Sequence, residues 1–251
     1  MTTVFDRIWV RQVTALAILL GLWEAAGAAG MLNPLYAPSP SQIGAALVQL
    51  FSDGSIWPHV EATFAAAIGG LVLGVLVGVM LGAAAALVPL VAQLLEPVMM
   101  MLNAVPRVVL APLCVIWFGI GLGSKVALSF VLVAVLIFFT VYTGIKQVDR
   151  RLVERVRTLG GSSWTVLREV YIPFVAAWIM GNLKVAVGFA FTGAVVGEFV
   201  GASRGLGYLL SFAQSTFNAA LMLALVFLIM GFVLAIFAAA GRIERRLLRW
   251  R

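Results

Sequence analysis

Long apolar runs, separated by short charged or turn-forming segments, make up most of this chain. A helix needs about 20 apolar residues to cross the ~30 Å hydrocarbon core of a membrane. Pro106 and Pro112 fall inside the third run, where each frees a backbone carbonyl and is expected to kink the helix. Residues 201–217, between the last two runs, are expected to form a loop. The pattern predicts an all-α membrane protein with a single transmembrane domain over residues 1–251. Its six transmembrane helices are expected at residues 13–31, 62–87, 97–118, 125–144, 176–200 and 218–240.

The segment at residues 34–60 connects the first two spans and is rich in polar and turn-forming residues. It contains a Pro-Ser-Pro-Ser motif at residues 38–41, and residues 42–51 then place Ile43 and Leu47 on one helical face. Such a face lies well at a membrane surface. We therefore expect a loop with one short amphipathic helix.

The longest charge-dense segment lies at residues 149–173, between the fourth and fifth spans. Its first half places apolar residues on one helical face and charges on the other. Gly160-Gly161 is expected to break this helix, and a second short helix, capped by Ser162 or Ser163, is expected to end at Pro173. The elbow predicts a partner with a groove. The alternative is a basic amphipathic segment on anionic lipid, which needs no such elbow.

Composition and charge distribution support a membrane location. The chain is 63% hydrophobic and 11% charged, whereas soluble domains carry about 25% charged residues. Basic residues gather at the ends of apolar runs, which indicates membrane topology rather than nucleic-acid binding. With the N-terminus inside, 13 of the 17 basic residues fall in the cytoplasm. Both termini and residues 149–173 are then cytoplasmic, and residues 34–60 are external.

The first apolar run resembles a signal peptide at its start but is expected to be retained. Arg7 and Arg11 precede it, as basic residues precede a signal sequence. The run then continues through Glu24 without a clear small-residue cleavage site. We expect Glu24 to be paired or to face water.

Glycines recur every four residues along two of the expected spans. Such ridges let another helix backbone approach closely in lipid. They serve either general helix packing or a dedicated dimer or pathway contact. The helix-packing candidates are Gly70, Gly74, Gly78, Gly82, Gly193 and Gly197.

Polar residues within spans are candidates for a translocation pathway, because charges inside a membrane are costly. Arg107 lies near mid-depth of the third span and suits either an anionic substrate or the carbonyls freed by nearby prolines. Lys184 is close to the cytoplasmic end of its span, so its side chain is expected to reach the interface. Glu198, near the outer end of that span, is expected either to gate the outer mouth or to pair with Arg204. The pathway candidates are Asn103, Arg107, Glu198 and Lys184.

No signature of catalysis or metal binding is present. The chain lacks a G-x-x-x-x-G-K-[ST] loop, a G-x-S-x-G motif and an H-E-x-x-H pair. Its one cysteine, Cys114, and one histidine, His59, cannot form a metal cluster, and His59 is expected to be solvated at the membrane boundary. We expect no catalytic residue, no metal and no cofactor in this chain. Any ATP-driven work must then come from a partner that binds ATP and Mg²⁺.

The segment at residues 149–173 resembles the EAA loop of the membrane subunits of bacterial ABC importers. Glu154, Gly160 and Pro173 keep the spacing of that motif, whereas residues 155–156 replace its two alanines and Ile172 replaces its leucine. Several other stretches, in order, are similar to the nitrate/sulfonate/taurine-type permease family. They are residues 38–41, 106–107, 111–112, 116–121, 157–160, 196–198, 201–203 and 205–208.

This resemblance implies a type I ABC importer permease in the bacterial inner membrane. It implies a second permease subunit, expected to be an identical copy, together with two cytosolic ATPase subunits and an external solute-binding protein. It suggests a small anion such as a sulfonate, taurine or nitrate, with a vitamin precursor or an aromatic acid as the alternative. The residues expected to dock the ATPase are Glu154, Arg157, Leu159, Gly160, Gly161, Ser162, Trp164 and Pro173, with Leu159 and Trp164 as apolar anchors.

Two other classes of function fit the sequence less well. A stand-alone secondary transporter predicts inverted repeats with paired broken helices, and none is evident. It would also leave the elbow without a role. A membrane-embedded enzyme would need facing His, Asp, Glu or Cys side chains, which one histidine and one cysteine cannot supply.

Overall fold

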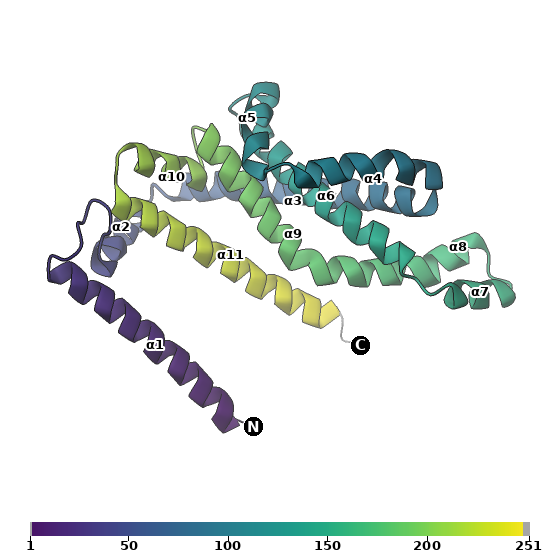
Figure 1. Ribbon diagram of the computed structural model, residues 1–251, viewed down its shortest axis with the longest axis horizontal. Helices are drawn as coiled ribbons and strands as arrows, with labels where there is room; N and C mark the ends of the chain where they lie inside the picture. The colour runs from purple at the N-terminus through teal and green to yellow at the C-terminus, as the bar shows by residue number, and fades with distance from the viewer. Residues whose placement is uncertain (1, 248–251) are drawn as a thin grey trace. The chain divides into compact units, whose positions relative to one another are not determined.

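Helices account for the regular structure of residues 2–247, the part of the chain that this computed structural model describes. No strand occurs in that range, so the all-α fold expected from the sequence is confirmed. The elements, most of them labelled in Figure 1, are α1 (Thr2–Ala28), α2 (Pro40–Ser52), α3 (Trp57–Leu87), α4 (Pro89–Ala104), α5 (Arg107–Phe118), α6 (Leu122–Lys146), α7 (Arg150–Thr158), α8 (Ser163–Val166), the π-helical turn η1 (Leu167–Tyr171), α9 (Ile172–Val200), α10 (Leu206–Ser215) and α11 (Ala219–Leu247).

Several of these elements can cross a membrane. Among the described residues, five helical stretches are long and apolar enough to do so. The pair α4–α5 makes a sixth if it is one broken span, bent by 109°. The five stretches are Ile8–Ala28, Trp57–Leu87, Leu122–Lys146, Ser163–Val200 and Ala219–Ala239.

The third membrane segment differs from the kinked helix expected at residues 97–118. It is two helices, because the chain turns at Val105 and Pro106. A proline pushes the residue before it into an extended conformation, and Val105 has φ −69° and ψ 128°. Pro97 and Pro112, in contrast, lie inside α4 and α5 without ending them. The sharp bend is therefore specific to Pro106.

The helices fall into two compact units. The first holds the chain up to Pro58 together with Leu209–Met230, and the second holds His59–Tyr208 and the chain from Gly231 onward. The connection at residues 201–217, expected as a loop, contains the helix α10.

In the first unit, α1 and α2 are joined through the Pro-Ser-Pro-Ser motif. The Glu24 carboxylate accepts hydrogen bonds from the Ser41 hydroxyl at 2.7 Å and the Ser41 N–H at 2.9 Å. Ser39 and Gln42 add a capping box at the start of α2. The acidic side chain in the first span therefore caps the next helix, and α2 confirms the short helix expected after this motif.

In the second unit, α6 packs between α3 and α9. A Cβ atom on Gly74 would lie 2.6 Å from the Val133 Cβ, and one on Gly193 would lie 2.6 Å from the Ser129 Cα. A Cβ atom on Gly70, Gly78 or Gly82 would likewise lie within 2.8 Å of an atom of α6. The glycine ridges thus lie against α6 of the same chain, where close backbone approach strengthens dispersion contacts in lipid. The Ser129 hydroxyl adds a buried hydrogen bond of 2.8 Å to the Ala190 carbonyl of α9.

Candidate functional site

The elbow between α7 and α8 is built from local backbone hydrogen bonds. The Asp149 carboxylate accepts the Arg151 N–H at 2.9 Å and caps the start of α7. At the other end, Gly161 N–H donates to the Val156 carbonyl at 2.9 Å, and Gly160 has a φ of 82°. This is the Schellman arrangement, in which a left-handed glycine ends a helix. The predicted break at Gly160-Gly161 is confirmed.

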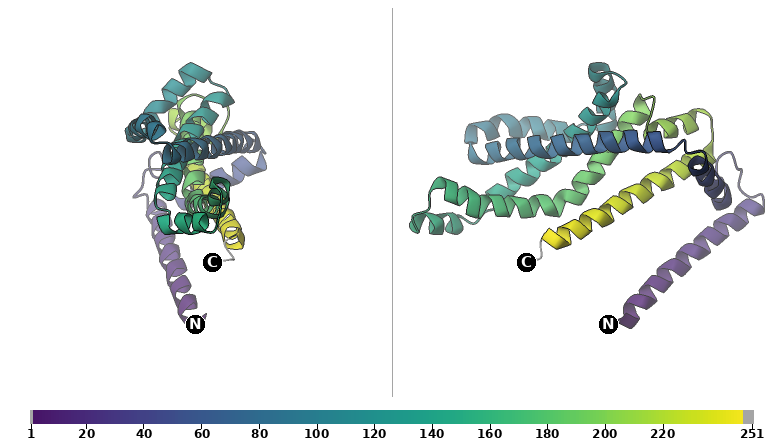
Figure 2. Two further views of the ribbon diagram at one scale, coloured as in Figure 1. Left: turned by 90° about the vertical axis from the view of Figure 1, so that its right-hand side faces the viewer. Right: turned by 180° about the vertical axis from the view of Figure 1, so that it is seen from behind.

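The second helix does not end at Pro173 as expected. Ser162 caps α8 by accepting the Thr165 N–H at 3.3 Å. The chain then passes through the π-helical turn η1 into α9, with Pro173 in the first turn of α9. A proline clashes with the carbonyl four residues earlier in a regular helix, and the wider turn of η1 comes directly before it. Figures 1 and 2 show the resulting continuous helical run from α8 into α9, which bends along its length.

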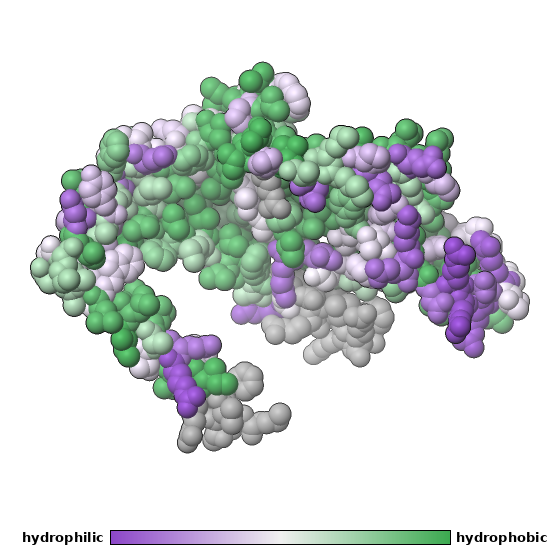
Figure 3. Space-filling view, viewed as in Figure 1, coloured by the Kyte–Doolittle hydropathy of each residue, from purple (hydrophilic) through white to green (hydrophobic). Residues whose placement is uncertain are grey.

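The segment from Asp149 to Pro173, called the docking segment below, presents both apolar and charged groups to its surroundings. Leu159 is 82% exposed and Trp164 is 66% exposed. Hydrophilic side chains gather over α7 in the space-filling view (Figure 3). Glu154, Arg157 and the other predicted docking residues are exposed, except that Gly161 is half-buried. The segment thus brings all the predicted docking residues onto one short structure.

A groove of about 390 Å³ lies beside the elbow. Leu152, Arg155 and Val156 of α7 form one wall, and Glu169 and Val170 of η1 contribute to the other. The groove has apolar walls with one acidic and one basic side chain at its edge. Such a surface can hold an apolar side chain and charged neighbours of another protein.

The predicted pathway residues are not gathered into one site. Asn103 lies near the end of α4 and is exposed. Arg107 begins α5, and its side chain lies outside the described part of the structure. Lys184 and Glu198 lie fourteen residues apart in α9, which at 1.5 Å per residue is roughly 20 Å. Lys184 lies beside Gly241 of α11.

Glu198 instead belongs to a buried polar cluster that the sequence pattern did not reveal. Only 2% of Glu198 is exposed, and its carboxylate accepts hydrogen bonds from Thr63 at 2.8 Å and the Gly207 N–H at 2.9 Å. Thr63 also accepts the Leu206 N–H at 2.8 Å. No ion pair with Arg204 occurs among the described residues. These bonds cap the first turn of α10 with side chains of α3 and α9.

His59 and Lys125 complete the cluster, and both differ from expectation. His59 is half-buried rather than solvated, since it accepts the Gly205 N–H at 3.1 Å and stacks on Tyr208 with ring centroids 5.8 Å apart. Lys125, expected at the outer end of the fourth span, is instead 3% exposed and donates to the Ile120 carbonyl and, at 2.5 Å, to the Gly201 carbonyl. The sequence feature that could have indicated the burial of Lys125 is its position as a lone charge in a long apolar stretch.

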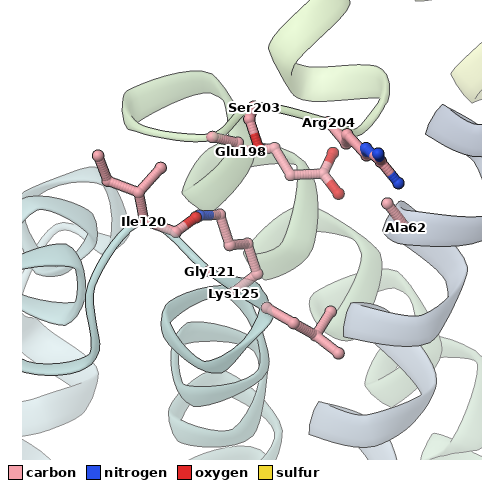
Figure 4. Close-up of a pocket in the computed structure, with 9 residues that line it drawn as sticks. Ala62, Ile120, Gly121, Lys125, Glu198, Ser203 and Arg204 are labelled. Atoms are coloured by element: carbon pink, nitrogen blue, oxygen red, sulfur yellow. The ribbon is translucent and has the colours of Figure 1, made fainter.

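The cluster surrounds a small cavity of about 180 Å³ (Figure 4). Lys125, Glu198 and Arg204 line it together with backbone of the loops before α6 and after α9. The positive ammonium group meets the Gly201 carbonyl at the end of α9, and the negative carboxylate meets the Gly207 N–H in the first turn of α10. Each charge thus faces the complementary end of a helix dipole. The arrangement holds the loop before α6 and the loop after α9 in place.

Comparison with known proteins identifies the class to which this fold and docking segment belong. Residues 70–249 match the family described as "Binding-protein-dependent transport system inner membrane component". The chain belongs to this family, the membrane-spanning permeases of ABC importers.

Individual relatives cover nearly the whole chain. The riboflavin transport system permease protein RibX of Chloroflexus aurantiacus is 33% identical over 94% of this chain and 88% of its own length. The taurine transport system permease protein TauC of Escherichia coli is 31% identical over 96% and 90%. The fold is similar to a chain of the inward-facing MetNI methionine ABC transporter, with a TM-score of 0.60, 22% identity and coverage of 76% of this chain and 93% of that one.

Proposed function

We propose that this permease forms, with a second identical copy, the translocation pathway of an ATP-driven importer in the bacterial inner membrane. Two separate cytosolic ATPase subunits supply ATP hydrolysis and hold ATP and Mg²⁺, and an external solute-binding protein delivers the substrate. The observation that carries this proposal is the docking segment, which exposes Leu159 and Trp164 on a capped elbow. Family membership supports it.

The docking segment suits a protein partner better than a lipid surface. Leu159 and Trp164 lie on either side of the glycine break, and the groove beside the elbow has a mixed apolar and charged lining. A lipid surface requires one continuous apolar face on a helix. An elbow with a neighbouring groove instead fits a protein partner whose surface is complementary in shape. We propose that its contacts are made by Glu154, Arg157, Leu159, Gly160, Gly161, Ser162, Trp164 and Pro173.

The proposed orientation places both termini and the docking segment in the cytoplasm. It rests on the positive-inside rule and on the 13 basic residues that this orientation assigns to the cytoplasm. Residues 34–60, including α2, are then external. Lipid contacts the exposed apolar faces of the spans.

The proposed substrate is a small anion such as taurine, another sulfonate or nitrate. The similarity to TauC, a taurine transport system permease protein, over 96% of this chain supports this class. RibX favours a second candidate, a vitamin or vitamin precursor. Asn103, Arg107, Glu198 and Lys184 remain the proposed pathway residues, and the positive charge of Arg107 suits an anion. Competition for uptake between radiolabelled taurine and unlabelled riboflavin distinguishes the two classes.

The docking proposal is tested by co-purification. The tagged permease is expressed with the ABC ATPase that accompanies the wild-type chain, and the ATPase retained after detergent extraction is measured. We expect Trp164→Ala and Gly160→Ala/Gly161→Ala to lose most of it. Trp57→Ala is the matched control, because Trp57 is also exposed, at 57%, but lies outside the docking segment. Full retention of the ATPase by both docking variants would contradict the assignment.

A further inference from the structure

A polar triad links α4 to the last turn of α6. The Tyr142 hydroxyl donates a hydrogen bond to the Glu96 carboxylate at 2.8 Å. The Lys146 ammonium group donates to the oxygen of the same hydroxyl and lies 4.1 Å from the centroid of the Tyr142 ring. Tyr142 is only 5% exposed. The Tyr142 hydroxyl therefore connects Glu96 of α4 with Lys146, one turn further along α6.

The triad sits at the start of the docking segment. Lys146 is the last residue of α6, and only Gln147 and Val148 separate it from Asp149, which caps α7. The Gln147 N–H continues the helical bonding by donating to the Thr143 carbonyl at 3.0 Å. Because only residues 147–149 join the two helices, a displacement of α7 pulls directly on the last turn of α6, where Tyr142 and Lys146 lie.

On its other side, the triad reaches the broken membrane segment. Glu96 lies on α4, eight residues before the helix ends at Ala104. α4 then passes through the bend at Val105 and Pro106 into α5. A shift of Glu96 along or around α6 therefore moves the pair α4–α5, which contains the proposed pathway residues Asn103 and Arg107.

Apolar packing alone does not fix the register of α4 on α6. Met99 of α4 packs with Val135, Phe138 and Tyr142 of α6 in one buried cluster. The Tyr142 ring stacks on Phe138 with ring centroids 5.7 Å apart. Contacts of this kind are individually weak and non-directional, so they do not by themselves select one position of Glu96 along α6. A hydrogen bond to a charged acceptor is directional and about twice as strong as a neutral one.

We propose that Tyr142 is a positioning residue that transmits movement of the docking segment to α4–α5 through the Glu96–Tyr142–Lys146 triad. This inference rests on the proposed function, since it needs an ATPase on the docking segment. The triad makes α4 follow the end of α6 during ATP hydrolysis. Without it, ATP is still hydrolysed, but the membrane helices follow less completely and less substrate moves for each ATP.

The test compares two single-hydroxyl variants of α6 in the complete complex. Tyr142→Phe removes the hydroxyl and leaves the ring against Phe138. Thr140→Val is the matched control, because its buried hydroxyl donates only to the Leu136 carbonyl of its own helix, at 2.8 Å. Permease, ATPase and solute-binding protein are reconstituted in liposomes, and substrate uptake and ATP hydrolysis are measured in the same vesicles.

We expect Tyr142→Phe to lower the substrate moved per ATP by about fivefold or more, the lower range of typical coupling between sites. Thr140→Val is expected to keep the wild-type ratio within about twofold. Glu96→Ala should reproduce the loss, and Glu96→Gln should restore most of it, since its amide oxygen can still accept the Tyr142 hydroxyl. The double variant Tyr142→Phe/Glu96→Ala should be no worse than either single one.

An unchanged ratio in Tyr142→Phe and Glu96→Ala would overturn the inference. So would a parallel fall of uptake and ATP hydrolysis, which indicates damage to assembly rather than to transmission. ATPase co-purification is measured on the same preparations. Full ATPase binding with an unchanged ratio rejects the triad alone. ATPase binding that survives both Trp164→Ala and Gly160→Ala/Gly161→Ala rejects the docking proposal itself.

Discussion

At the scale of single residues, the buried hydroxyl of Thr63 holds two parts of the chain together. It accepts the Leu206 N–H at 2.8 Å and donates to Glu198 at 2.8 Å, and the residue is fully buried. A buried donor left without a partner costs about 1–3 kcal/mol. Thr63 thus supplies the partner of the Leu206 N–H, while Glu198 supplies that of the next N–H, from Gly207.

Thr63→Val should therefore destabilise the protein by about 1–3 kcal/mol, because it leaves the Leu206 N–H and Glu198 without their partner. Thermal unfolding of the purified permease in detergent, followed with a thiol-reactive or tryptophan signal, measures the change in midpoint. Thr192→Val is the control, since its exposed hydroxyl bonds only to the Gly188 carbonyl of its own helix. Equal midpoints for the two variants would contradict the structural role of Thr63.

Residue-level features were predictable from the sequence where their cause is local. Gly160 adopts its left-handed conformation because the Schellman arrangement that ends α7 requires it. The two adjacent glycines in the sequence indicate such a helix end directly. The bond between His59 and Gly205 joins residues 146 positions apart. Nothing near His59 in the sequence indicates that partner, so its solvated position was predicted wrongly, and the burial of Lys125 was not predicted.

At the scale of helices, the glycine ridges decide how closely α3 and α9 approach α6. Gly193 contacts the backbone of Ser129, and a Cβ atom there would lie 2.8 Å from the Ser129 nitrogen. Backbone cannot move aside as a flexible side chain can. Gly181, on the same helix, has open space where its Cβ would be.

Gly193→Leu should consequently separate α6 from α9 and abolish monodisperse protein in detergent, whereas Gly181→Leu should preserve it. Fluorescence-detected size-exclusion chromatography of tagged variants provides the measurement. The expected result follows from overpacking, which costs about 1–3 kcal/mol even where some relaxation is possible. A sharp, wild-type elution peak for Gly193→Leu would show that the helices pack differently.

Helix existence was easier to predict than helix ends. Long apolar runs define the spans, because length and hydrophobicity alone are required to cross a membrane. The ends depend on backbone conformation at single residues. Pro106 produces a turn where a kink was expected, and Pro173 begins a helix where an end was expected. The π-helical turn that accommodates Pro173 has no periodic signal in the sequence.

At the scale of the whole molecule, the account requires the docking segment and residues 34–60 to lie on opposite sides of the membrane. Leu159 is 82% exposed and Tyr36 is 80% exposed, so each accepts a cysteine with little disturbance. The native Cys114 is buried, so it should contribute little labelling by a thiol-reactive reagent.

A membrane-impermeant maleimide should therefore label Tyr36→Cys when applied to the external face of the inner membrane in spheroplasts. Leu159→Cys should react only after the membrane is opened. The positive-inside rule is the physical reason, since basic segments stay on the cytoplasmic side. Labelling of Leu159→Cys in intact spheroplasts would reverse the proposed orientation.

The central claim is that this chain provides a membrane passage and that a separate ATPase drives it. Uptake of substrate into proteoliposomes tests this most directly, with the purified permease alone and with the complete complex. We expect no accumulation by the permease alone, with or without ATP, and ATP-dependent accumulation once ATPase and solute-binding protein are present. Accumulation by the permease alone would contradict the account.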